Sequence, residues 1–185
     1  MTRPGVRVRL ALYAIVCLAQ LGAAGFAIAR HERTLATGER FLFRVAPVDP
    51  EDPFRGRYLQ LGFLAARLER EAPAGGYERV YAVLERDADG FARFGALSAE
   101  APVGRPYLAT RVAWTGPSRI QLDLPFARYY EEESIARAAD KALAEYARTG
   151  GAGAHVAVRV LDGHAVLEEL YLGGVPLRER LRHAR

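Results

Sequence analysis

Two carboxylates and a guanidinium lie together in one short segment, residues 46–63, which reads APVDPEDPFRGRYLQLGF. Asp49 and Asp52 each precede a proline, and a proline holds both itself and the preceding residue in an extended conformation. Acidic side chains, Arg55 and aromatic rings on such a stiff backbone have the chemistry to bind a ligand or a partner protein. The candidate residues of this binding or structural motif are Asp49, Asp52, Phe54, Arg55, Gly56, Tyr58, Leu61 and Phe63.

The same segment also has a structural interpretation, as a stiff loop that feeds a central strand. Gly56 permits a bend or bulge where a side chain would clash. Beyond it, side chains alternate between the two faces of a strand, which places Leu59, Leu61 and Phe63 together on an apolar face. We favour the structural interpretation and keep the binding interpretation open.

Two further groups of residues resemble metal ligands but lack the required spacing. His155 and His164 flank a predicted hairpin turn without a cysteine nearby, and their separation matches no usual zinc motif. We therefore interpret them as surface histidines near a turn. Asp87 and Asp89 before Gly90 lack the later oxygen ligands and closing glutamate of a calcium loop, so they predict a plain turn. No metal or other cofactor is expected.

The sequence also lacks the usual motifs of enzyme active sites. The only lysine, Lys141, lies seven residues from Ser134, a separation of about 10 Å on one helix and too far for a Ser–Lys pair. The chain contains neither a Gly-x-Ser-x-Gly elbow nor a glycine-rich phosphate loop. We expect a protein that is not an enzyme.

The charge distribution argues against nucleic-acid binding. The chain has 26 basic and 22 acidic residues, but Arg3, Arg7 and Arg9 precede the first apolar segment, and the remainder is nearly neutral. A phosphate backbone requires clustered positive charge, which this remainder lacks. The single cysteine, Cys17, excludes an intramolecular disulfide.

The apolar segment Leu10–Ala29 predicts a transmembrane anchor. Its only polar side chain is Gln20, and as a helix it would span about 30 Å, the thickness of a bilayer core. A cleaved signal peptide is the alternative, since Ala27-Ile28-Ala29 resembles a cleavage site, but the apolar run is longer than usual for one. Gln20 is either a contact to another transmembrane helix or a tolerated polar residue.

Topology and domain boundaries follow from the anchor. We expect residues 1–9 to form a cytoplasmic tail, 10–29 the anchor, 30–37 a juxtamembrane spacer and 38–185 one extracytoplasmic domain. Arginines flank the anchor on both sides, so the positive-inside rule is close to a tie. Because a short tail usually stays inside, we expect a single-pass protein of the cell inner membrane with a periplasmic domain.

The domain is expected to be α+β, mostly antiparallel β with one amphipathic helix. Strands are predicted in residues 38–48, 56–68, 79–85, 91–98, 106–114 and 120–124. A last hairpin, His155–Leu161 and Ala165–Leu172, turns at Asp162-Gly163. Glu131–Ala147 has apolar residues at helical spacing and precedes two glycines, so it predicts the helix.

The segment Gly56–Phe63 resembles the motif of the GDYXXLXY family, a group of bacterial membrane-anchored proteins without an established activity. Gly56, Tyr58 and Leu61 match the motif, whereas Arg57 replaces its aspartate and Phe63 its second tyrosine. The preceding run from Val48 to Arg55, the apolar helix, the Tyr129-Tyr130 pair and the closing strands also resemble the family. The charge reversal at Arg57 argues against a catalytic carboxylate there.

The resemblance implies an accessory role, since members are often encoded beside multi-spanning membrane proteins. Our leading interpretation is a membrane-anchored extracytoplasmic interaction module, an accessory subunit of such a protein. The alternative is a stand-alone ligand-binding or envelope-sensing domain that uses the Asp49–Phe63 segment as the lip of its pocket.

Overall fold

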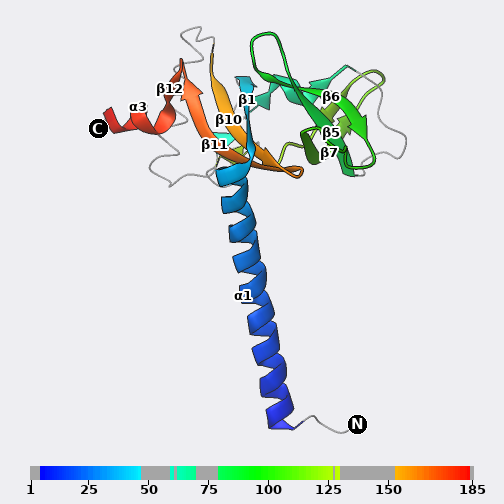
Figure 1. Cartoon of the computed structure of the whole chain (residues 1–185), viewed down its shortest axis with the longest axis vertical. Coiled ribbons are helices and arrows are strands. Elements are labelled where there is room, and N and C mark those ends of the chain that lie inside the picture. The colour runs from blue at the N-terminus through cyan, green and yellow to red at the C-terminus, as the bar shows by residue number, and fades with distance from the viewer. Residues whose placement is uncertain are drawn as a thin grey trace.

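The computed structural model describes residues 5–46, 59–60, 62–69, 79–126, 128–129 and 153–183. Its longest element is α1 (Val6–Thr37), one uninterrupted helix that stands out from the β domain as a stalk (Figure 1). Apolar side chains such as Leu18 and Leu21 are about two-thirds exposed along it. Among the described residues, α1 is the one helix long and apolar enough to cross a membrane. The predicted spacer, residues 30–37, forms its last two turns.

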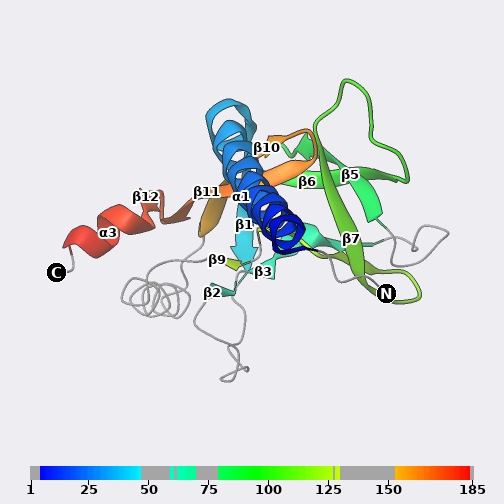
Figure 2. The same ribbon diagram turned by 90° about the horizontal axis from the view of Figure 1, so that it is seen from below.

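The chain passes from helix to sheet at a single residue, Gly38. The first sheet has five antiparallel strands in the order β12-β11-β10-β1-β3. In chain order these strands are β1 (Glu39–Ala46), β3 (Gly62–Phe63), β10 (His155–Leu161), β11 (His164–Leu172) and β12 (Val175–Pro176). The short helix α3 (Leu177–His183) follows β12. Seen from below, α1 ends beneath this sheet, beside β1, β10 and β11 (Figure 2).

A second antiparallel sheet of five strands lies beside the first, in the order β4-β8-β7-β5-β6 (Figure 1). Its strands are β4 (Arg67–Leu68), β5 (Arg79–Arg86), β6 (Ala92–Ser98), β7 (Tyr107–Thr115) and β8 (Ile120–Leu122). The 3-10 turn η1 (Leu64–Ala66) leads into β4. A separate two-stranded pair consists of β2 (Leu59–Gln60) and β9 (Arg128–Tyr129).

One hydrophobic core serves both sheets. Its centre is Phe43 of β1, whose ring centroid lies 6.1 Å from Phe63, 5.8 Å from Phe94 and 5.0 Å from Phe126. All four rings are at most 6% exposed. Because Phe43 and Phe63 belong to the first sheet and Phe94 to the second, the rings join the two sheets through an aromatic contact.

Backbone contacts join the sheets at a second place. The turn between β10 and β11 meets β7, where the amide of Ala109 donates a hydrogen bond of 3.0 Å to the carbonyl of Gly163. Gly163 has a φ of +76°, and a Cβ there would lie 2.6 Å from the ring of Tyr107. A glycine is therefore required both by the turn and by the close approach of β7.

The α+β class and the antiparallel strands predicted from the sequence are confirmed. The last hairpin turns at Asp162-Gly163 as expected, and Asp87–Gly90 forms the turn between β5 and β6. The predicted helix, Glu131–Ala147, lies outside the described residues.

The prediction of one continuous strand over residues 56–68 was wrong in its described part. This part contains three short strands and the turn η1. β2 pairs with β9, β3 with β1 and β4 with β8. Phe63 lies on β3 at the end of the described first sheet rather than in a central strand. A run of apolar residues indicates burial, but it does not distinguish one long strand from several short strands that belong to different sheets.

Candidate functional site at the junction of helix and sheet

α1 joins the domain at Gly38. Its amide donates a hydrogen bond of 2.9 Å to the carbonyl of Thr34, which ends the helix. A Cβ on Gly38 would collide with that carbonyl oxygen and lie 3.1 Å from the backbone nitrogen and oxygen of Val160. Gly38 is buried. A glycine therefore lets the end of the helix contact the backbone of β10 directly.

Thr34 makes the second contact of the junction. It is 1% exposed, and its hydroxyl donates a hydrogen bond of 2.9 Å to the carbonyl of Arg30, one turn earlier. The same hydroxyl oxygen lies 3.1 Å from Nδ1 of His164, the first residue of β11. When the hydroxyl donates its one proton to the carbonyl of Arg30, the imidazole donates here, which assigns the ring proton to Nδ1.

His164 also lies in a basic environment. Its ring is half-buried, and the ring centroid of His31 on α1 is 6.4 Å away in an edge-on arrangement. Burial lowers the pKa of His164 below its usual value of 6.5, and the charges of Arg30 and His31 lower it further. The imidazole is therefore held neutral near pH 7.

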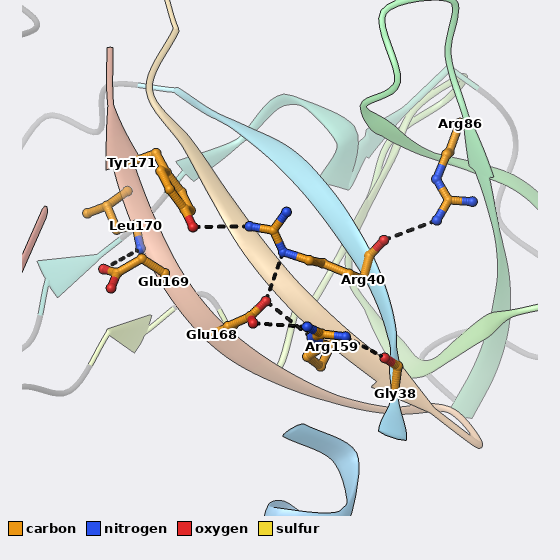
Figure 3. Close-up of polar contacts among 8 residues, drawn as sticks. All are labelled: Gly38, Arg40, Arg86, Arg159, Glu168, Glu169, Leu170 and Tyr171. Atoms are coloured by element: carbon orange, nitrogen blue, oxygen red, sulfur yellow. Dashed lines mark hydrogen bonds and ion pairs between the residues drawn. The ribbon is translucent and has the colours of Figure 1, made fainter. Parts of the chain in front are cut away.

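A network of charged side chains continues from the junction across the outer face of the first sheet (Figure 3). Glu168 accepts hydrogen bonds from Arg159, at 3.1 and 3.2 Å, and from Arg40, at 2.9 Å. Arg159 also donates to the carbonyl of Gly38 at 3.1 Å, and Arg40 donates to the hydroxyl of Tyr171 at the same distance. Three strands and the end of the helix are thus connected by side chains.

The carboxylate of Glu168 is the centre of this network. Its partial burial by itself would raise its pKa, but the hydrogen bonds from Arg159 and Arg40 outweigh that effect and lower the pKa below its usual value of 4.5. Glu168 is therefore ionised at neutral pH and bridges two cations.

The far end of the same face carries a ladder of rings and guanidinium groups. The rings of His155 and Tyr171 stack with centroids 5.0 Å apart and planes 5° from parallel. Phe91, from the turn between β5 and β6, meets His155 edge-on at 5.6 Å, and the guanidinium carbon of Arg44 lies 4.0 Å from the centroid of the Phe91 ring. Each contact links the first sheet to that turn or to a neighbouring strand.

The carboxylates once considered as calcium ligands bind arginine instead. Arg44 reaches Asp87 at 2.5 Å and Asp89 at 2.6 Å. Hydrogen bonding from Arg44 is the main cause that lowers the pKa of Asp87. Asp87 Oδ1 also accepts the amides of Asp89 and Phe91, which closes the turn, and Gly90 has a φ of +83°. The interpretation of this segment as a plain turn fits these contacts.

The interpretation of the two histidines as surface residues near a turn was wrong in position for His155, whereas His164 does lie beside the turn. His155 begins β10 at the end opposite to the turn, and His164 alone follows the turn. Both rings are half-buried, and each has a polar partner: His155 Nδ1 donates to the carbonyl of Gly153 at 3.0 Å. The two are directed to different sites because nine residues of a hairpin place them at opposite ends of its strands.

Of the candidate motif, only Phe63 falls within the residues that the structure describes, and it is a core residue, 6% exposed. A position so enclosed by rings accommodates phenylalanine in place of the tyrosine of the family motif. The other members lie outside the described residues, namely Asp49, Asp52, Phe54, Arg55, Gly56, Tyr58 and Leu61. Their role stays a prediction. Gln20 is exposed on α1.

Sequence reasoning missed the residues that form the junction. Thr34, Arg159 and Glu168 carry no motif, and only the folded register brings them together. Gly38 gave a signal, since it stands where apolar spacing changes from helical to alternating. A glycine at such a change indicates a tight passage between two elements.

Comparison with protein families settles the relationship. The family model described as "GDYXXLXY protein" matches residues 20–170. The chain belongs to the GDYXXLXY family. The match begins within α1 and ends within β11, so it includes the junction as well as the motif segment. Neither the curated proteins nor the solved structures that were compared contain a significant match to this GDYXXLXY protein.

Proposed function

We propose that this GDYXXLXY protein is a membrane-anchored interaction module, an accessory subunit whose helix and extracytoplasmic domain bind a multi-spanning membrane protein as one stiff unit. The observation that supports it best is the packed junction. Gly38 and Thr34 are buried against β10 and β11, so the helix joins the sheet without a free linker. An anchor that serves only as a tether has no need of such a joint.

Retention of the helix is part of the proposal. Cleavage after Ala29 would divide α1, which continues for eight more residues to Thr37. The residues beyond that point, including Thr34, pack against the domain. A helix continuous through the cleavage position is typical of an anchor, whereas a signal peptide usually ends in an extended, accessible segment.

The partner surface in the membrane is proposed to centre on Gln20. This amide lies midway along the apolar helix and is exposed, and a Cβ added at Gly22 or Gly25 would meet no atom within 4 Å. Polar groups in lipid gain from a hydrogen bond to another helix, and small residues allow backbones to approach. We propose a non-catalytic role for the domain, since the described side chains form structural networks rather than an arrangement of nucleophile and base.

The test is photo-crosslinking of the full-length protein in its native membrane. A photo-reactive benzoylphenylalanine at Gln20 is expected to capture a multi-spanning protein in near-stoichiometric yield. The same group at Leu18, two residues away and so on nearly the opposite side of the helix, is the matched control and is expected to capture lipid instead.

A second variant separates anchoring from recognition. Exchange of residues 10–29 for an unrelated transmembrane helix of equal length is expected to keep the protein in the membrane and abolish copurification of the partner. A preparation that contains no partner with either helix would contradict the accessory role and favour a stand-alone ligand-binding domain.

A further inference from the structure

His31 and His164 meet at the end of the domain from which α1 leaves, and Arg30 precedes His31 on the helix. His31 and His164 lie with ring centroids 6.4 Å apart, and Arg30 acts on His164 through its charge. Among the described residues no carboxylate forms an ion pair with these three, although Glu32 and Asp162 are near in sequence and exposed. In contrast, Arg40 and Arg159 higher on the sheet each form an ion pair with Glu168. Within the described part of the chain, the positive charge of this cluster therefore has no acidic partner.

The position of this cluster along α1 gives it a fixed depth. If Leu10–Ala29 fills the hydrocarbon core, His31 and Thr34 stand about 3 and 8 Å beyond its edge, at about 1.5 Å per residue. The headgroup layer occupies about 5–8 Å on each side of the core. His164 contacts both residues, at 6.4 Å between rings and 3.1 Å from the hydroxyl, so it lies at the same level.

We infer that Arg30, His31 and His164 form a binding site for the phosphate of a membrane lipid headgroup. The inference depends on the proposed function, since it requires α1 to span the membrane. The phosphate would supply the negative charge that the cluster lacks. Bound there, it would connect the helix, the hairpin between β10 and β11, and the bilayer surface, and so fix the height of the domain above the membrane.

The chemistry of the site favours a phosphate over a water-filled gap. Arg30 offers a planar set of donors, and His164 already commits Nδ1 to Thr34, which leaves Nε2 to receive a proton and donate to the phosphate. Arg30 and His31 currently disfavour that proton through their positive charge. A phosphate beside the ring would reverse this effect, whereas simple burial in lipid would strengthen it.

The test measures the pKa of His164 in the full chain by NMR of its ring nitrogens, in maltoside micelles and in phosphatidylcholine nanodiscs. Maltoside carries no phosphate, and phosphatidylcholine carries phosphate without a net surface charge. We expect the pKa of His164 to be higher in the nanodiscs by about one unit. His155, at the opposite end of β10, is the internal control and should show no comparable shift. In Arg30→Gln, the difference between the two media should fall by at least half.

Three results would overturn the inference. An unchanged or lower pKa of His164 in nanodiscs, with α1 shown to span the bilayer by protection from protease, refutes the lipid site and leaves the anchor intact. An equal rise in micelles on addition of inorganic phosphate assigns the site to a soluble anion. A chain that does not insert into the nanodiscs contradicts the proposed function, and the inference fails with it.

Discussion

At the scale of single residues, two threonines near the end of α1 make the same bond to the helix but differ in burial. Thr34 and Thr37 each donate a hydrogen bond of 2.9 Å to the carbonyl four residues earlier. Their surroundings differ: Thr34 is 1% exposed and is hydrogen-bonded to His164, whereas Thr37 is exposed. The chain thus offers a matched pair with the same local chemistry.

Thr34→Val is expected to destabilise the domain by about 1–3 kcal/mol, because it leaves the Nδ1 proton of a half-buried imidazole without an acceptor. Thr37→Val should change stability by less than about 0.5 kcal/mol. Denaturant unfolding of the full chain in micelles, followed by fluorescence of its single tryptophan, measures both. Equal effects at the two positions would show that the contact with His164 contributes nothing.

A second pair of neighbours tests the shared core. Phe63→Ala should cost about 3–5 kcal/mol, because this ring packs between Phe43 and Phe126 at centroid distances of 6.1 and 5.3 Å. Leu64→Ala, at the next residue, should cost far less because Leu64 is 58% exposed. The same unfolding measurement applies. A small effect of Phe63→Ala would contradict a core that joins the two sheets.

At the scale of elements, the first sheet is connected both to the helix and to the second sheet by arginines. Arg86 of β5 donates to the carbonyl of Arg40 at 3.0 Å (Figure 3). It also forms an ion pair of 2.8 Å with Glu39. Arg159 donates to Gly38 from within β10. Arginines from β5 and β10 therefore both bond to the segment that connects α1 with β1.

Two glutamates allow this network to be tested against a control. Glu168 bridges Arg40 and Arg159 at the junction, and Glu85 bridges Arg93 and Arg105 in the second sheet. Both side chains are about 30% exposed. Each Glu→Gln substitution should cost about 1 kcal/mol, since partly exposed pairs are screened by solvent. Only Glu168→Gln should also change the angle between α1 and the sheet, measured by spin-label distances.

The Glu168 network also predicts a dependence on pH. The pKa of Glu168 is below its usual value of 4.5 in the folded state, so its ionisation stabilises the fold above that value. This contribution is lost as the pH falls through the folded pKa. The stability difference between the unsubstituted protein and Glu168→Gln should therefore shrink in acid. A difference that is constant from pH 7 to pH 3 would contradict the lowered pKa.

The sequence predicted elements well where a local pattern was sufficient. Alternation identified β1 and the last hairpin, and Asp162-Gly163 identified its turn, because these signals depend on neighbouring residues. Prediction from the sequence failed for residues 59–68, where successive short strands pair in different sheets. It also failed for His155, whose neighbours Tyr171 and Phe91 are distant in sequence. Of the junction, only Gly38 gave a signal in the sequence; the contacts of Thr34, Arg159 and Glu168 depend on tertiary register.

At the scale of the whole molecule, α1 and the domain meet at Gly38 and pack against each other there (Figure 1). Helix, hairpin and sheet contact one another without an intervening loop, so we expect a displacement of the helix to move both sheets with it. A stiff connection is what the proposed accessory role requires, since a partner that binds the helix would then also fix the position of the domain.

The most direct test is the distance between the helix and the domain in lipid nanodiscs, measured by double electron–electron resonance spectroscopy. One spin label occupies the native Cys17 on α1 and the other an exposed strand position, Ala96→Cys on β6. We predict one narrow distance distribution, which three residues, Gly-Ser-Gly, inserted after Thr37 should broaden. A broad distribution without the insertion, or the loss of Cys17 from the mature chain through cleavage, would contradict the account of a retained, stiffly joined anchor.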